Sequence, residues 1–368
     1  MMWIIIFGLM LICGIGGIIF LLTRFRRFGF VRKLAGNNNR LAWLLAGIPI
    51  LLIGTSAFIS VFAFIVILIH LAVFWLICDL AAHIVKRITK KDARRYYAGA
   101  AALAITAVYL SIGWFLAHHV YRTEYSISTS KFIGMEKMRV VMLADLHLGI
   151  TLDGDGFARQ MKRIEDEKPD VVIIPGDFVD DSSRKDDMIK ACKALNINTT
   201  FGVYFIYGNH DKGYYNNRDF TYEELEEELC KNGVTILKDE CVLVSRLFYI
   251  IGRQDKSEEE RASMEELMTG IDKSKYIIVA DHQPNSYDEE AESGADLVLS
   301  GHTHGGHIWP AGQIGLLIGA NDRIYGMEKR NDTTFIVTSG ISGWAIPFKT
   351  GTKSEYVVID IEPKQNAD

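Results

Sequence analysis

The chain has 368 residues, of which 49% are hydrophobic, and a formal net charge of −5. The charge is unevenly divided, because residues 1–125 contain 13 Lys and Arg against 3 Asp and Glu, which leaves 27 against 42 for residues 126–368. This division predicts a basic part and an acidic part in different surroundings, and the acidic part is a poor electrostatic partner for nucleic acid, so we expect no nucleic-acid partner.

The basic part contains apolar segments that are long enough to cross a bilayer as helices. Residues 4–22 have no charge. A second uncharged stretch, residues 41–78, continues past Asp79 to Val85. As one helix of about 45 residues it would be nearly 70 Å long, roughly twice the thickness of the hydrocarbon core. We therefore predict two spans joined by a turn near residues 54–56. The four predicted spans are about residues 4–22, 41–59, 62–82 and 97–117.

The loops between these spans predict the orientation of the chain. Arginines and lysines fill the first connection, residues 24–40, and the third, residues 86–95. Basic loops stay in the cytoplasm, and two loops share a side only if an even number of spans separates them. The fourth span then leaves the cytoplasm. We expect a multi-pass protein of the cell membrane with residues 1–122 as a transmembrane anchor, the bilayer as its partner, and an extracytoplasmic domain over residues 126–368.

After residue 138 the pattern changes to short apolar runs that alternate with charged amphipathic stretches. Fully apolar runs of this length are typical of strands buried on both faces, and their alternation with helices predicts an α/β layered fold. Further β-rich sequence at residues 234–251 and 333–361 indicates additional antiparallel strands. The predicted strands are residues 139–144, 170–174, 202–207, 275–280 and 296–299, and the predicted helices are residues 156–168, 185–195, 221–232 and 258–269.

Each of these predicted strands ends in a cluster of polar residues and glycine. In open α/β sheets, ligands bind outside the carboxyl ends of the strands, so the five clusters should converge in space. The clusters are Asp145-Leu146-His147, Pro175-Gly176-Asp177, Gly208-Asn209-His210-Asp211, Asp281-His282 and Gly301-His302-Thr303-His304.

The side chains in these clusters have the chemistry of metal ligands. Carboxylates, an amide oxygen and several imidazoles together favour divalent transition metals over calcium or magnesium. Of the ten histidines, five lie in these clusters, and His307 follows three residues later. The five cysteines have no CxxC spacing, which argues against structural zinc and against a disulfide framework.

The order of the motifs DLH, GDFVD, GNHD, a single His after a strand, and GHTH resembles the calcineurin-like metallophosphoesterase superfamily over about residues 138–345. The resemblance implies a four-layer αββα sandwich, here preceded by a bundle of about four transmembrane helices. It also implies two divalent ions, Mn, Fe or Zn. The implied ligands are Asp145, His147 and His304 for one ion and Asn209, His282 and His302 for the other, with Asp177 bridging both.

The resemblance extends to residues around the metal ligands. His210 is similar to the family histidine that protonates or stabilises the leaving oxygen, and we expect Asp211 to orient its imidazole. Asp180, in GDFVD, is either a further carboxylate beside the site or a helix-start residue. The GHTHGG variant after membrane spans resembles a bacterial membrane-associated branch related to lipid-A-type UDP-diacylglucosamine pyrophosphatases. His307 replaces the Gln often found there, and Lys349 stands near the place of an Arg, so the substrate stays open.

The predicted function is that of an enzyme, a membrane-anchored metallophosphoesterase. Two ions can align a hydroxide for in-line attack on phosphorus. We expect hydrolysis of a phosphodiester or pyrophosphate bond, in a phosphorylated small-molecule or lipid-linked substrate of the cell envelope. The alternative is a non-catalytic membrane sensor or scaffold that binds phosphorylated ligands. Degenerate metal ligands would favour that alternative, and the sequence has none.

Overall fold

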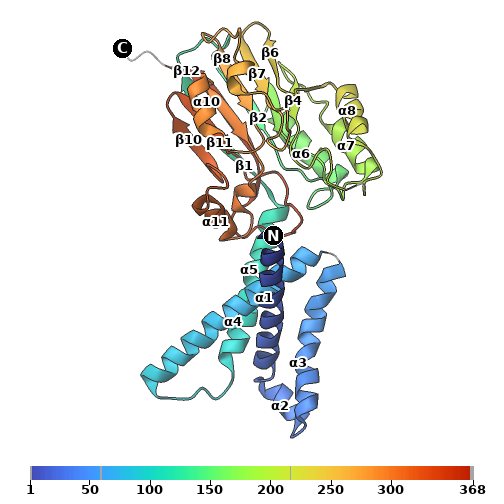
Figure 1. The fold of residues 1–368 in the computed structure, drawn as a ribbon, viewed down its shortest axis with the longest axis vertical. Helices are drawn as coiled ribbons and strands as arrows, with labels where there is room; N and C mark the ends of the chain where they lie inside the picture. Colours follow the sequence, from blue (N-terminus) through green and yellow to red (C-terminus); the bar gives the residue numbers. More distant parts are fainter. Residues whose placement is uncertain (1, 59, 216, 365–368) are drawn as a thin grey trace. The chain divides into compact units, whose positions relative to one another are not determined.

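The computed structural model describes residues 2–58, 60–215 and 217–364, with side chains from Gly14 onward. The chain divides into two compact units, Met1–Gly113 and Trp114–Asp368. The first unit is helical, and the second contains two β-sheets with helices (Figure 1). The boundary between the units lies within a helix, so the last turn of that helix belongs to the second unit. The predicted anchor and domain bounds, at residues 122 and 126, stay predictions.

Among its described residues, the helical unit has three helices that are long and apolar enough to cross a membrane, Asn39–Phe58, Val61–Thr89 and Tyr97–His118. The predicted turn between the second and third spans is confirmed: the first of these helices ends in a 3-10 turn, and the side chain of Ser60 caps the next one by accepting from Ala63 N. The first predicted span, residues 4–22, lies within α1, and its side chains before Gly14 lie outside the described residues. The elements are α1 (Met2–Phe25), α2 (Gly29–Ala35), α3 (Asn39–Gly54), η1 (Thr55–Phe58), α4 (Val61–Thr89) and α5 (Tyr97–His118).

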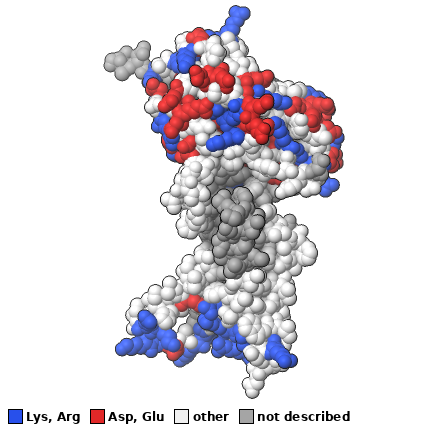
Figure 2. Space-filling model, in the orientation of Figure 1, with Lys and Arg blue, Asp and Glu red and all other residues white. Residues whose placement is uncertain are grey.

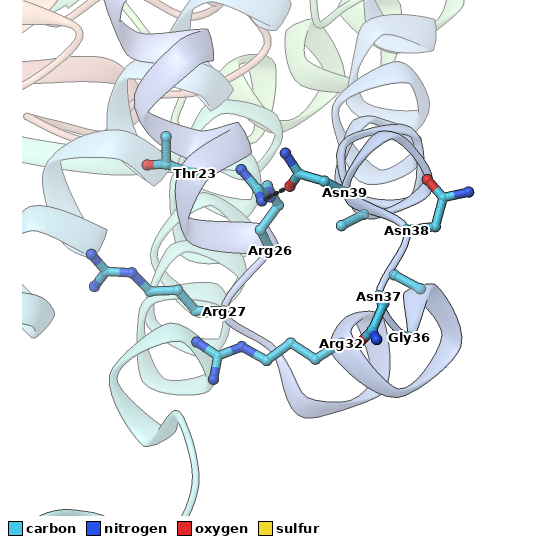
Figure 3. A pocket seen from close by; sticks show the side chains of 10 residues that line it. Thr23, Arg26, Arg27, Arg32, Gly36, Asn37, Asn38 and Asn39 are labelled. Carbon is cyan, nitrogen blue, oxygen red and sulfur yellow. Dashed lines mark hydrogen bonds between the residues drawn. The ribbon is translucent and has the colours of Figure 1, made fainter.

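Ionic contacts at one end of the helical unit join the first basic connection to α4. Asp79 forms ion pairs with Arg24, at 2.7 Å, and with Arg27, at 3.4 Å. The same carboxylate accepts a hydrogen bond from the Tyr96 hydroxyl, just before α5. Lysines and arginines gather at this end (Figure 2), where a hollow of about 430 Å³ is lined by residues that include Arg26 and Arg32 (Figure 3). That both basic loops share one side of the membrane stays a prediction.

The second unit contains two six-stranded sheets. All five strands predicted from apolar runs are confirmed, as β2, β3, β4, β8 and β9, and the β-rich stretches supply further strands. The first sheet has the order β1 (Val120–Thr129), β12 (Ser354–Pro363), β2 (Met138–Met142), β3 (Val171–Pro175), β4 (Val203–Ile206) and β5 (Val234–Ile236). The second has the order β10 (Gly326–Arg330), β11 (Thr333–Val337), β9 (Leu297–Ser300), β8 (Tyr276–Ala280), β7 (Phe248–Gly252) and β6 (Glu240–Val244).

The sheets face each other and are covered on their outer faces by helices, which confirms the four-layer αββα arrangement. Alternate residues of a strand point to opposite faces. In β2, Val140 packs in the core between the sheets, whereas Val141 packs in a second core with Phe157 and Met188 from helices on the outside. In the second sheet, Val298 packs in a third core with helical residues. The outer helices are α6 (Gly154–Asp166), α7 (Lys185–Ala194) and α8 (Tyr222–Lys231) on the first sheet, and α9 (Met264–Leu267) and α10 (Tyr287–Ser293) on the second.

The structure differs from the sequence prediction at one helix and one strand. The predicted helix 258–269 is wrong in its extent, because α9 covers Met264–Leu267 only. A capping box, in which Ser263 and Glu266 exchange hydrogen bonds with each other's backbone amides, fixes its start. Strand β1 was not predicted. It lies at a sheet edge with alternate residues exposed, so its sequence, VYRTEYSIST, lacks a continuous apolar run.

Candidate metal centre

The seven predicted ligands follow the ends of strands from both sheets. Asp145 and His147 follow β2, Asp177 follows β3, and Asn209 follows β4. Strands β2, β3 and β4 are parallel neighbours, so their carboxyl ends lie along one edge. The other sheet supplies His282 after β8 and His302 and His304 after β9. A hydrogen bond from His302 N to Asp145 Oδ1, at 2.8 Å, links the two sheets at this edge.

The backbone at this edge is strained where the ligands sit. A non-glycine residue rarely adopts a left-handed conformation, and each case costs on the order of 1–3 kcal/mol. Gly176 has φ +83°, and a Cβ there would lie 2.5 Å from Gly208 N, so only glycine permits this approach. Such strain persists when surrounding contacts hold it, and it is typical of functional sites. Five of the seven predicted ligands have positive φ, namely Asp145 (54°), His147 (37°), Asp177 (55°), His302 (68°) and His304 (47°).

Three of the seven side chains form a first group. One ligand atom each from Asp145, His147 and His304 lies within 4.8 Å of the others, and all three residues are buried. The Nε2 atoms of the two histidines are 3.1 Å apart. His147 Nδ1 is 3.0 Å from Asp180 Oδ2, to which it donates, so its Nε2 keeps a lone pair directed at the group.

Three others form a second group. The ligand atoms of Asp177, His282 and His302 also lie within 4.8 Å of one another. Asn209 Oδ1 joins them, 3.1 Å from His282 Nε2 and 2.9 Å from His302 Nδ1. His282 Nδ1 donates to the Pro175 carbonyl at 2.8 Å, which fixes the ring and directs Nε2 into the group.

Asp177 lies between the two groups. Its Oδ2 is 3.4 Å from His147 Nε2 and 3.2 Å from His282 Nε2. The seven side chains therefore form the two spatial groups that the resemblance implies, and one Asp177 oxygen lies between the two groups. Their roles as ligands stay a prediction.

Carboxylate and amide oxygens face imidazole nitrogens here, which is the mixed ligand set that suits divalent cations. Asp145 Oδ2 is buried without a hydrogen-bond donor, and buried polar atoms normally have a partner. Burial alone would lower the pKa of His282, but the negative charge of Asp177 outweighs this effect and raises that pKa well above its usual value. The site therefore attracts positive charge. Burial lowers the pKa of His302 to about 4, so this imidazole is neutral at neutral pH and can act as a ligand. The residues present thus fit divalent metals.

His210 lies beside this centre, half-buried. Its ring centroid is 4.9 Å from that of His147, and its Nδ1 is 3.8 Å from Asp180 Oδ2. Burial lowers the pKa of His210, so the neutral ring predominates at neutral pH and offers an N–H as a hydrogen-bond donor. Of the two readings of Asp180, the structure favours the carboxylate beside the site, because it contacts His147 and stands next to His210.

The prediction that Asp211 orients His210 is corrected by the structure. The fully buried Asp211 carboxylate accepts four backbone amides, from Asp177 at 2.8 Å, Phe178 at 2.7 Å, Val179 at 3.0 Å and Gly208 at 2.7 Å. With both oxygens used by the two loops after β3 and β4, the side chain holds the backbone of the predicted ligands in place. Asp180 is the carboxylate near the His210 ring.

Some residues around the centre were not found by sequence reasoning. Asp255 is buried after the end of β7, accepts from Gln283 Nε2 at 2.9 Å and from the Ser257 amide at 2.9 Å, and acts electrostatically on His282. The strand-end argument applied to β7 would have found it. Trp344 has no such signal, since its ring reaches His210, at 5.7 Å between centroids, from a loop.

Lys349 and His307, the two departures from the related branch, lie close to the centre, with Lys349 fully buried and His307 partly buried. Lys349 Nζ donates to the carbonyls of Ser339, at 2.6 Å, and Gly340, at 3.1 Å, and Gly340 packs against Asp145. Burial lowers the pKa of Lys349 to about 7. Burial and the charge of Lys349 lower the pKa of His307 to about 3, so His307 is a neutral, structural side chain beside the loop that bears Trp344.

Comparison with known proteins shows what the second unit is similar to. A family model described as calcineurin-like phosphoesterase matches residues 138–306. An uncharacterized metallophosphoesterase of Helicobacter pylori is 30% identical over 240 residues, which are 63% of this chain and 62% of that protein. One of Aquifex aeolicus is 29% identical over 251 residues, 66% of this chain and 92% of that protein. A Danio rerio transmembrane protein with metallophosphoesterase domain is 27% identical over 242 residues, 59% of this chain and 52% of that protein. The chain thus matches less than two thirds of the length of the Helicobacter relative.

Proposed function

We propose, from the premise that this chain carries a calcineurin-like metallophosphoesterase domain, that it hydrolyses a phosphodiester or pyrophosphate bond in an envelope or lipid-linked substrate. The observation that supports this most is the shared position of Asp177, whose Oδ2 faces a histidine of each group within 3.4 Å. A paired arrangement of this kind suits two divalent ions, for which Mn, Fe and Zn match the mixed oxygen and nitrogen donors.

Ions bound there would supply positive charge that lowers the pKa of water and neutralises the phosphate oxygens. The chain's own residues do the remaining work. Asp145, His147 and His304 would hold one ion, and Asn209, His282 and His302 the other. The ring N–H of His210 would stabilise charge on the leaving oxygen, and the Asp180 carboxylate lies 3.8 Å from Nδ1 of that ring.

The membrane part of the proposal rests on the three apolar helices and on the basic end of the helical unit. Helix Asn39–Phe58 and helix Val61–Thr89 form an even pair of spans between the two basic loops. By the positive-inside rule both loops then face the cytoplasm, and α5 leads outward. The chain would therefore be a multi-pass membrane protein with the phosphoesterase unit on the extracytoplasmic side.

An activity measurement tests the proposed function. The purified full chain, loaded with Mn²⁺, should hydrolyse at least one of a panel of phosphomonoester, phosphodiester, nucleotide-sugar and lipid-pyrophosphate substrates. Asp177→Asn should abolish that turnover, because the shared oxygen is lost as a charged ligand. Asp272→Asn, an exposed carboxylate in the same unit, is the matched control. Undiminished turnover in Asp177→Asn would refute the proposal.

A further inference from the structure

Directly after the predicted ligand His304 and the short turn η2 (His304–Gly306), the chain forms an exposed apolar segment. Residues 308–321, called here the apolar segment, contain no Asp, Glu, Lys or Arg and include the short helix α11 (Ala311–Leu317). Large apolar side chains in a soluble loop are normally covered, and contiguous exposed ones mark interaction surfaces. Four side chains of the segment are more than half exposed: Trp309 (59%), Ile314 (53%), Leu317 (87%) and Ile318 (72%).

The apolar segment is held firmly to the domain. Trp309 N donates to Thr350 Oγ1 at 3.1 Å, and the amides of Thr350 and Gly351 both donate to His307 O at 3.0 Å. A Cβ added to Gly312, within α11, would lie 2.5 Å from Gly306 Cα, so the helix packs directly against the turn that bears His304. The exposed side chains are therefore presented by a fixed scaffold joined to the metal centre.

The apolar segment lies at the end of its unit where the chain arrives from α5. The last turn of α5 is fixed to β12 by a hydrogen bond from Ser354 Oγ to Ala117 O, at 2.7 Å. Ser354 follows Gly351 by three positions, so their Cα atoms are at most about 11 Å apart. Figure 1 shows α11 at this end of the unit, and Figure 2 shows this end as white on the face drawn. The half-exposed Trp114 and Phe115, in the last turn of α5, are typical of an aromatic belt at a membrane surface.

An aromatic surface continues from the apolar segment to the metal centre. His307 immediately precedes the segment, and a Cβ on Gly343 would lie 3.8 Å from His307 Nε2. The next residue, Trp344, is partly exposed, and its ring is 5.7 Å from that of His210. Tyr214 borders His210 on another side, with 5.0 Å between centroids. A series of contacts thus runs from His307, next to the segment, through the loop that bears Trp344 to His210.

We propose that the apolar segment lies in the boundary between headgroups and acyl chains of the bilayer that α5 crosses, and that it admits a membrane-borne phosphoester to the metal centre. The surface has the uncharged, aromatic and aliphatic composition of a membrane-contacting element. Its fixed place beside the last turn of α5 puts it at the depth of the aromatic belt. The membrane contact stands on these observations alone, whereas the delivery of substrate rests on the proposed function.

Lipid quenching tests the membrane contact without any enzymatic readout. A fluorophore is attached to Leu317→Cys in the full chain, with Cys230→Ser removing an exposed native thiol. The protein is placed in vesicles of phosphatidylcholine and phosphatidylglycerol, with and without brominated phosphatidylcholine. Phe132→Cys is the matched control, since Phe132 is 74% exposed and lies just beyond the opposite end of β1, a strand about 30 Å long. We expect strong quenching by brominated lipid at position 317 and little at 132. Equal quenching by brominated lipid at both positions would overturn the membrane contact. A fluorophore at 317 that is quenched by iodide in the aqueous phase but not by brominated lipid would overturn it as well.

A substrate comparison tests the delivery. The double variant Leu317→Asp, Ile318→Asp is compared with Phe132→Asp on phosphatidyl-p-nitrophenol in vesicles and on bis-p-nitrophenyl phosphate in solution. The ratio of vesicle to soluble turnover should fall roughly tenfold or more in the double variant, because carboxylates replace two side chains that favour the apolar phase. An unchanged ratio would overturn the delivery. If neither variant nor the unmodified chain hydrolysed either compound, the proposed function would fail while the quenching result kept its meaning.

Discussion

Replacing Asp211 by Asn tests whether one buried carboxylate holds the loops that bear the predicted ligands. Each oxygen of Asp211 accepts two backbone amides, at 2.7–3.0 Å, from the loops after β3 and β4. Asn keeps one such oxygen and places an NH₂ group where the other was, so two buried amides lose their acceptor. Each unsatisfied buried donor costs about 1–3 kcal/mol, which gives about 2–6 kcal/mol for Asp211→Asn. For a unit of this size the melting temperature should fall by roughly 5–20 °C.

The assay is thermal unfolding of the full chain, followed by near-UV circular dichroism of the phosphoesterase unit. Asp272→Asn is the control, because this carboxylate also accepts a backbone amide, from Ser274 at 3.0 Å, but is exposed to solvent. The control should melt like the unmodified protein. If Asp211→Asn also melted within about 2 °C of it, the four amide hydrogen bonds would not be the contacts that hold these loops, and Asp211 would not have this structural role.

The remaining predictions concern catalysis, pH and topology. His210→Ala should lower kcat by roughly 10²–10⁴-fold for an alkyl leaving group but much less for p-nitrophenolate, which needs no stabilisation, with the metal content unchanged; equal losses would contradict the role of its N–H. The pKa of Lys349 is 10.5 in the unfolded chain and about 7 in the folded protein. Between pH 7 and 10.5 the unfolded chain therefore binds more protons than the folded protein, and the free energy of unfolding should rise with pH in this range. Relative to Lys349→Met, the free energy of unfolding should increase by up to about 1.4 kcal/mol per pH unit from pH 7 to 9, measured by urea denaturation, and a flat difference would refute this. A reporter fused to the C-terminus should be active outside the cytoplasm, and cytoplasmic activity would refute the proposed orientation.

Much of the fold was predictable because its central strands are buried on both faces. Such strands read as continuous apolar runs, as in DVVIIP before Gly176, and they were found correctly. The edge strand β1 alternates buried and exposed residues and has neighbours on one side only, so it left no comparable run. The short helices α9 and α11 depend on a cap and on packing against glycine rather than on periodicity.

The candidate site was predictable as a set of positions but not as a set of contacts. Strand ends and residue types located all seven side chains that the structure brings together. The sequence does not show which carboxylate lies beside the His210 ring. Both Asp180 and Asp211 are candidates, and only the path of the backbone decides between them. The positive φ angles of the ligands are equally invisible to sequence, because they come from the two sheets meeting at one edge.

Metal content tests the central claim most directly. The full chain, loaded with Mn²⁺ and separated from free ions by gel filtration, should retain two ions per chain by elemental analysis. His282→Ala should retain about one, because it removes a ligand from only one of the two groups. Two retained ions in the unmodified protein, reduced by His282→Ala and not by Asp272→Asn, are the result the account predicts. An unmodified chain that retains no ion, or a His282→Ala variant that retains both, would contradict it.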